Sequence, residues 1–220
     1  MLEVTHSFYQ ISHDSIIFVK LVKPFSRFLF RYPKPGRTNP FVNVYISRVG
    51  NRNPRALLLQ PPKYFDDKER LIYTVTWAND DEISLTWETR HQNYSLVSIC
   101  DSGANCRDSL VMTEPNGWMD LDFNPIFSQD GRQFAMILSS EGYKHVNVIN
   151  RDTNQRVPIT SGEMVVTNLY YWDEGQSSHF SLFGDHFGGK TADDLCVKVG
   201  KSESIQVLEE SFVIKCNGRK

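Results

Sequence analysis

The sequence predicts an all-β protein whose strands form propeller blades, each blade being a sheet of about four antiparallel strands. Stretches in which apolar and polar residues alternate recur from about residue 40 onward, and turn residues bound each stretch. A unit of strand, turn, strand, polar loop and strand then recurs after about fifty residues, a period typical of propeller blades. The aromatic share of 12% also favours strands, and no helix longer than two turns is expected.

The expected strands follow one another with short polar connections. Asn79-Asp80-Asp81 marks one turn, and Ser128-Gln129-Asp130-Gly131, which follows Phe127, marks a hairpin because Asp-Gly favours tight turns. Pro33, Pro35 and Pro40 indicate a stiff, extended loop. Strands are predicted at residues 41–47, 71–77, 83–87, 94–100, 133–138, 145–150, 169–172, 179–183, 205–208 and 212–216.

The repeat distinguishes a propeller from the main alternative, a β-sandwich. Trp77, a turn, Ile83-Ser84-Leu85 and then residues 93–97 form the first copy. Phe127, a turn, Phe134-Ala135-Met136 and then residues 143–148 form the second copy. Sandwich strands are not expected to repeat in this way, so the propeller is the preferred interpretation.

Composition restricts the classes of function. The chain has 220 residues, of which 40% are hydrophobic and 23% charged, with a net charge of -2. This balance predicts no nucleic-acid partner. Charged residues and a histidine interrupt the apolar N-terminal stretch, which therefore falls short of the roughly 20 residues of a membrane span. Neither a transmembrane segment nor a signal peptide is expected in this sequence.

Cysteines and one sequon point to an oxidising compartment. The even count and the two separated pairs of cysteines suit two local disulfides, at Cys100, Cys106, Cys196 and Cys216. No Cys-x-x-Cys and no histidine at zinc-finger spacing accompany them, so a metal site is the weaker alternative. Asn93-Tyr94-Ser95 is a glycosylation sequon shortly before Cys100, which makes Asn93 a candidate glycan site.

Seven short motifs occur in an order that one family shares. They are Tyr-Pro-Lys-Pro-Gly-Arg-Thr-Asn-Pro at 32–40, Ile-Ser-Leu-Thr-Trp at 83–87, Arg-His-Gln-Asn-Tyr-Ser at 90–95, Ile-Cys-Asp at 99–101, Gly-Trp at 117–118, Phe-Ser-Gln-Asp-Gly at 127–131 and Glu-Gly-Tyr-Lys-His at 141–145. Over roughly residues 32 to 220 the chain resembles the dipeptidyl peptidase IV family of serine peptidases, which belong to the prolyl oligopeptidase type.

The resemblance implies a specific domain organisation. In this family a propeller of about eight blades precedes an α/β-hydrolase domain, and the chain resembles the second half of the propeller. We therefore expect a partial β-propeller of about four blades at residues 32–220, preceded by a poorly defined segment at residues 1–31. The resemblance also implies that Cys100 pairs with Cys106 and that Cys196 pairs with Cys216.

The resemblance implies that the catalytic residues lie elsewhere. The family releases N-terminal dipeptides after Pro or Ala with a Ser-Asp-His triad, whose serine sits in Gly-x-Ser-x-Gly. That motif does not occur in this sequence, so no catalytic residue and no cofactor is expected here. The family's acidic pair for the substrate amino group finds no match, and Glu209-Glu210 lie in a different blade. Phe123 is the one candidate for lining the substrate cavity.

Three other groups of residues are interpreted as structural. His179, Asp185 and His186 would suit a metal, but their context favours a loop. The Gly-rich stretch at 184–189 does not precede a helix, so a phosphate loop is not expected. The four tryptophans are expected in the blade cores: Trp77, Trp87, Trp118 and Trp172.

Three functions remain open from the sequence. The first is the substrate-gating part of a dipeptidyl exopeptidase, with the hydrolase domain of the full-length protein, substrate peptides and a homodimer as partners. The alternative is a non-catalytic relative that modulates a partner such as a potassium channel, and the third is a free-standing interaction module. The resemblance implies the extracellular face of the plasma membrane or secretion. Because about four blades cannot close a ring, residues 1–220 alone are expected to aggregate or oligomerise.

Overall fold

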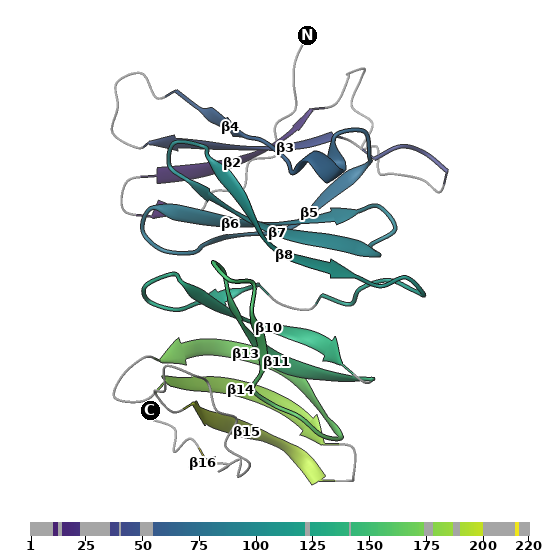
Figure 1. The fold of residues 1–220 in the computed structure, drawn as a ribbon, viewed down its shortest axis with the longest axis vertical. Helices are drawn as coiled ribbons and strands as arrows, with labels where there is room; N and C mark the ends of the chain where they lie inside the picture. Colours follow the sequence, from purple (N-terminus) through teal and green to yellow (C-terminus); the bar gives the residue numbers. More distant parts are fainter. Residues whose placement is uncertain are drawn as a thin grey trace, which may run out of the picture. The chain divides into compact units, whose positions relative to one another are not determined.

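The computed structural model describes residues 11–12, 15–22, 36–39, 41–48, 55–121, 124–140, 142–173, 178–186, 190–199 and 214–215. In this part of the chain, four sheets of four strands each are formed, and neighbouring strands are consecutive in sequence (Figure 1). Their pairing is antiparallel throughout. The predicted all-β class with four-stranded antiparallel sheets is confirmed. The chain divides into two compact units, Met1–Met119 and Asp120–Lys220, which are described separately.

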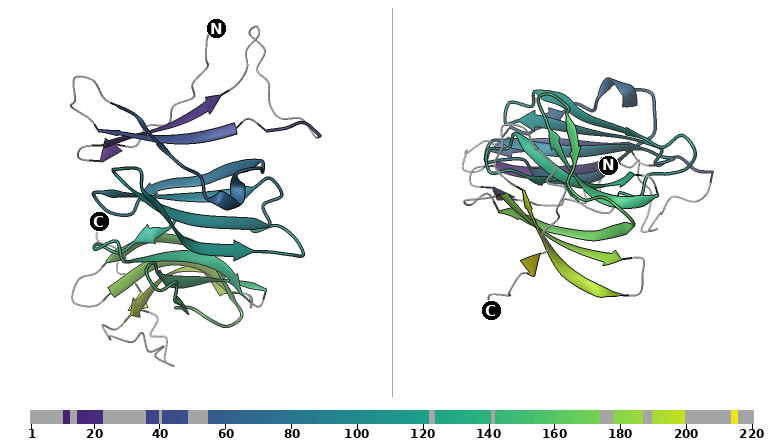
Figure 2. Two further views of the ribbon diagram at one scale, coloured as in Figure 1. Left: turned by 45° about the horizontal axis from the view of Figure 1, so that its top comes forward. Right: turned by 60° about the horizontal axis from the view of Figure 1, so that its bottom comes forward.

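The first unit contains two sheets. The first comprises β1 (Ile11–Ser12), β2 (Ser15–Val22), β3 (Phe41–Arg48) and β4 (Leu57–Leu59), and the short 3-10 helix η1 (Lys63–Phe65) follows. The second comprises β5 (Arg70–Trp77), β6 (Glu82–Thr89), β7 (Tyr94–Asp101) and β8 (Cys106–Thr113). β2 and β3 pair along their whole length from Ser15↔Arg48 to Val22↔Phe41, and both belong to the purple to blue N-terminal sheet of Figure 2.

One apolar core joins these two sheets. Successive side chains of a strand point to opposite faces, so Ile83, Leu85 and Trp87 of β6 share one face. All three are fully buried and belong to a cluster with side chains of the first sheet and of η1: Val44, Ile46, Leu59 and Phe65. Burial of each such side chain contributes about 1.5–3 kcal/mol. The opposite face of β6 carries the polar residues Ser84, Thr86 and Glu88.

The second unit also contains two sheets. One comprises β9 (Ile126–Phe127), β10 (Gln133–Ser140), β11 (Tyr143–Asn150) and β12 (Arg156–Pro158). The other comprises β13 (Met164–Asp173), β14 (Ser178–His186), β15 (Lys190–Val199) and β16 (Ile214–Lys215). Their shared core contains residues of β10, β11 and β13: Ala135, Ile137, Val146, Val148, Val166 and Leu169.

Side-chain hydrogen bonds close the predicted turns. Between β5 and β6, the Asn79 side-chain oxygen accepts hydrogen bonds from the amides of Asp81 and Glu82 at 2.9 and 2.8 Å. Between β9 and β10, Asp130 accepts from the Arg132 amide at 2.9 Å, and Gly131 takes a φ of 66°. The Asp-Gly hairpin and the repeated strand pairs β6–β7 and β10–β11 are thus confirmed.

The structure differs from the sequence-based expectations in two places within these sheets. No blade strand was expected before residue 32, yet β1 and β2 complete the first sheet, because β3 provides a partner for all eight residues of β2. His179, Asp185 and His186 lie in β14 rather than in a loop, because pairing with β15 continues past Gly184 despite an irregularity there. The predicted strand at 205–208 lies outside the described residues.

The tryptophans also differ from one another. Trp87 is fully buried, and Trp77 and Trp172 pack against the two cores. Trp118 is 70% exposed, so its expected place in a blade core was wrong. None of the helices in the described part of the chain is long and apolar enough to span a membrane.

Candidate functional site

The β7–β8 hairpin carries a disulfide between Cys100 and Cys106. The two residues are direct partners in the strand register, with their Cα atoms 4.0 Å apart. Within the loop, the Asp101 carboxylate accepts hydrogen bonds from the amides of Gly103 and Asn105 at 2.8 and 2.9 Å. The side-chain amide of Asn105 donates to the same carboxylate and is the main reason that the pKa of Asp101 is lowered.

Of three other candidate residues, the structure describes only Cys196. Cys196 lies in β15, where its backbone pairs with Ile214 of β16. Cys216 and Phe123 lie outside the described residues. The bridge between Cys196 and Cys216 and the cavity role of Phe123 therefore stay predictions.

The sequon lies where β6 turns into β7. Asn93 is exposed, and its side-chain oxygen accepts a hydrogen bond from the Thr89 hydroxyl at 3.0 Å. Ser95 is fully buried in β7, and its hydroxyl donates to the carbonyl oxygen of Trp87 at 3.1 Å. The exposed position of Asn93 suits a bulky surface modification, and its glycosylation stays a prediction.

The same turn holds the segment that follows β8. Gln92 adopts a left-handed φ of 55°, and its carbonyl oxygen accepts a 2.7 Å hydrogen bond from the Met119 amide. The adjacent carbonyl oxygen of Asn93 accepts from the Glu114 amide at 2.9 Å. These two backbone bonds tie both ends of residues 114–119 to the turn and present the exposed Trp118 between them.

Glu88 is the residue that the sequence reasoning missed. Its exposed fraction is only 1%, although it carries a carboxyl group. The Gln92 side-chain amide donates to Oε2 at 3.3 Å, while the buried Oε1 has no hydrogen-bond partner in the described part of the structure. Burial raises the pKa of Glu88, and the Gln92 hydrogen bond opposes this effect. The signal in the sequence was a glutamate that directly follows the strand motif ending at Trp87 and so continues the same strand.

A second glutamate has the opposite environment. Arg90 donates to Glu69 Oε2 at 2.6 Å, and the Asn39 amide approaches the same oxygen at 3.4 Å. The Arg90 hydrogen bond is the main cause that lowers the pKa of Glu69. The pair thereby connects the proline-rich loop, the start of β5 and the β6–β7 turn.

An aromatic stack lies at the start of β7. The rings of Tyr64 and Tyr94 are 3.7 Å apart and nearly parallel, and the Lys68 ammonium lies 3.1 Å from the centre of the Tyr64 ring. Tyr64 remains 40% exposed, whereas the neighbouring Phe65 is fully buried in the core. The stack therefore connects the core to the exposed ring of Tyr64, which the Lys68 ammonium group covers in a cation–π contact.

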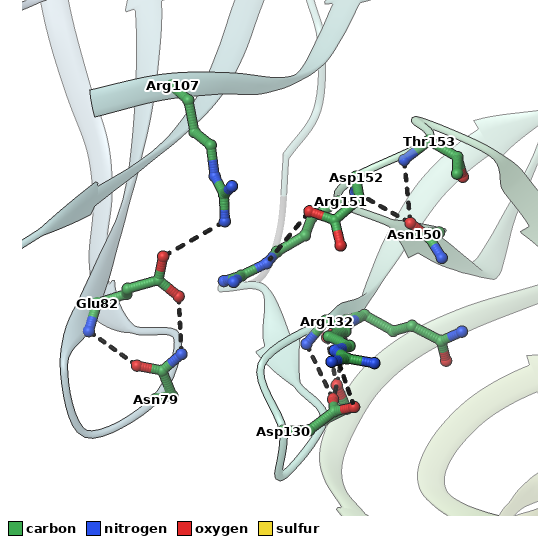
Figure 3. A network of polar contacts seen from close by, with 11 residues as sticks. Asn79, Glu82, Arg107, Asp130, Arg132, Asn150, Arg151, Asp152 and Thr153 are labelled. Carbon is green, nitrogen blue, oxygen red and sulfur yellow. Dashed lines mark hydrogen bonds and ion pairs between the residues drawn. The ribbon is translucent and has the colours of Figure 1, made fainter. Parts of the chain in front are cut away.

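Figure 3 shows polar contacts at the hairpin ends of the two units. In the first unit, Arg107 reaches Glu82 at 3.4 Å, and Asn79 donates to the same carboxyl group at 2.8 Å. In the second unit, the Asn150 side-chain oxygen accepts from the amides of Asp152 and Thr153 at 3.0 Å. These contacts fix turns, and no metal-binding group of three His, Cys, Asp or Glu residues occurs among the described residues.

Comparison with known proteins places these features in a family. Residues 21–180 match the model of the dipeptidyl peptidase IV N-terminal region. Dipeptidyl peptidase 4 of Felis catus is 32% identical over 152 residues, covering 63% of this chain and 20% of the relative. Inactive dipeptidyl peptidase 10 of Rattus norvegicus is 27% identical over 155 residues, covering 66% of this chain and 19% of the relative.

A solved structure shows the same fold. The crystal structure of Porphyromonas gingivalis dipeptidyl peptidase 4 superposes with a TM-score of 0.65 at 17% identity, covering 88% of this chain and 33% of that one. The chain thus spans about a fifth of the length of the curated relatives that it matches. Because the family model matches most of the sequence, the chain belongs to the dipeptidyl peptidase IV N-terminal region family.

Proposed function

We propose that this chain is the propeller portion of a dipeptidyl peptidase IV-like serine exopeptidase and that it has no catalytic activity by itself. The observation that carries the proposal is the family match over residues 21–180, on a chain folded as four-stranded antiparallel sheets. The catalytic groups would come from a hydrolase domain, since the sequence contains no Gly-x-Ser-x-Gly.

The proposed contribution of the propeller is to control access of short peptides to the hydrolase domain. The segment after β8 supports this role, because it presents Trp118 at the surface with 70% of the residue exposed. The Cys100–Cys106 disulfide and the exposed sequon at Asn93 support an extracellular or secreted location, where disulfides persist and glycans are attached.

The test compares this chain with the product of the same gene extended beyond Lys220. Release of N-terminal Xaa-Pro dipeptides is measured for both proteins, and for the extended protein with the serine of any Gly-x-Ser-x-Gly changed to alanine. The proposal expects activity in the extended protein alone, abolished by the substitution. Activity of residues 1–220 alone would contradict it.

The alternative is a non-catalytic relative that modulates a membrane partner such as a potassium channel. This alternative is supported by the similarity of the chain to inactive dipeptidyl peptidase 10 of Rattus norvegicus. It predicts that the extended protein folds but has no reactive serine and releases no dipeptide. A change in the current of a co-expressed potassium channel would then be the positive measurement.

A further inference from the structure

A buried carboxyl group is connected to the surface segment that carries Trp118. Glu88 belongs to β6, where its register partners are Leu71 of β5 and Ser95 of β7. Neither partner carries a charge, and Glu88 is 1% exposed. Burial of an ionised carboxylate without a paired cation is unfavourable. Packing alone therefore does not explain why β6 carries a carboxyl group at residue 88.

The connection runs through Gln92. The Gln92 side chain donates to Glu88 Oε2 at 3.3 Å, and its backbone amide donates to the Thr89 carbonyl oxygen at 2.9 Å. These two bonds hold a residue other than glycine at a φ of 55°, a conformation that L-residues rarely adopt. In this conformation the Gln92 carbonyl oxygen accepts the 2.7 Å hydrogen bond from Met119.

We propose that Glu88 is a pH-responsive anchor that acts through the Gln92 amide to set the position of residues 114–119. Gln92 is the positioning residue in this relay, and the Met119 amide is its end point. The relay does not depend on the proposed peptidase role, since it involves only residues of the first unit.

The direction of the response follows from the surroundings of Glu88. Burial is the larger influence on its pKa and raises it, while the Gln92 hydrogen bond lowers it. The two register partners of Glu88, Leu71 and Ser95, carry no charge, and the Gln92 amide that contacts its carboxyl group is neutral. As the pH rises, ionisation of Glu88 therefore favours states in which the carboxylate reaches water, and the Gln92 turn loosens. The Met119 hydrogen bond is most persistent when Glu88 is protonated.

Hydrogen exchange of the Met119 amide tests the relay in the full 220-residue chain. Protection factors, corrected for the intrinsic pH dependence of exchange, are measured between about pH 5 and pH 9 by mass spectrometry with residue-level fragmentation. Above the pKa of a buried acid, each pH unit favours an open, ionised form by up to about tenfold. Met119 protection in the wild type is expected to fall several-fold, while the Leu85 amide in β6 stays protected.

Three variants separate the relay from general effects. Glu88→Gln keeps the size of the side chain without a charge, so Met119 protection should become independent of pH. Gln92→Gly keeps the left-handed turn without the side-chain amide, so the pH dependence should also disappear. Glu163→Gln, at an exposed position, should behave like the wild type. A pH-independent wild type, or a pH response that survives in either Glu88→Gln or Gln92→Gly, would overturn the proposal.

Discussion

Glu69 and Glu88 are the same residue type in opposite environments. The Arg90 hydrogen bond lowers the pKa of Glu69, so this glutamate stabilises the fold above its unfolded-state pKa. That stabilisation is lost as the pH falls through the lowered folded-state pKa. Burial raises the pKa of Glu88, so its position is best tolerated in acid. Its contribution to stability falls as the pH rises from the unfolded-state pKa through the raised folded-state pKa.

Amide substitutions at the two glutamates should therefore have opposite effects. At pH 7, Glu88→Gln is expected to raise the free energy of unfolding by about 1 kcal/mol, because it removes a carboxyl group whose ionisation is opposed by burial. Glu69→Gln is expected to lower the free energy of unfolding. The effect should be small, because the ion pair with Arg90 is partly exposed. Urea denaturation at pH 4, 5.5 and 7 measures both effects. If both substitutions changed the free energy of unfolding in the same direction at pH 7, the opposite environments of the two glutamates would be contradicted.

Gly142 illustrates how a single backbone angle restricts a position. It connects β10 and β11 with a φ of 85°, and an added Cβ atom would meet nothing within 4 Å. Gly142→Ala is expected to destabilise the chain by about 1–2 kcal/mol through backbone strain alone. Gly117→Ala is the matched control, because Gly117 has no left-handed φ and its nearest neighbour is the Glu114 Cγ atom at 3.9 Å. Thermal unfolding of both variants tests this, and equal losses would contradict the strain argument.

At the scale of the element, the β7–β8 hairpin combines a strand register with a covalent bond. Replacing Cys100 and Cys106 together by alanine is expected to lower the free energy of unfolding by about 2 kcal/mol, the loop-closure value for so short a loop. Guanidinium denaturation of the double variant measures the loss. Asn105→Ala keeps the bridge and removes exposed hydrogen bonds to Asp101, so its loss should be smaller. A larger loss in Asn105→Ala would contradict this ranking.

The elements that the sequence predicted are those with local signals. β6 and β10 alternate clearly and follow turns that Asn79 and Asp130 close with their own side chains. β2 was missed because its partner β3 follows a long connection, so the pairing depends on tertiary contacts. The exposure of Trp118 was missed because backbone bonds from Glu114 and Met119 hold its segment, and no side-chain pattern encodes them.

The candidate site shows the same division. The cysteines of the β7–β8 hairpin and the sequon are local motifs, and both were found from sequence. Glu88 was not, because its chemistry depends on burial, and burial is a property of the assembled sheets. The glutamine that contacts it belongs to a family motif whose residues carry no sign of a left-handed turn.

At the scale of the whole molecule, we expect residues 1–220 to self-associate when expressed alone. β8 is the terminal strand of its sheet and exposes 52% of Val111. Terminal strands with exposed apolar residues pair readily with other chains. Light scattering coupled to size-exclusion chromatography should give a mass above the 25.4 kDa of one chain. Val111→Lys should reduce the association more than Thr113→Lys, which adds the same charge to the same strand. A monodisperse 25.4 kDa species would contradict the expectation.

The pairing of β2 with β3 has a practical consequence for anyone who shortens this chain. A boundary chosen from the family match would begin at residue 21, and one chosen from the proline motif would begin near residue 32. Either cut removes most or all of β2 and leaves β3 as a bare edge beside the buried Val44 and Ile46. A shortened protein that begins before Ile11 would retain the whole first sheet.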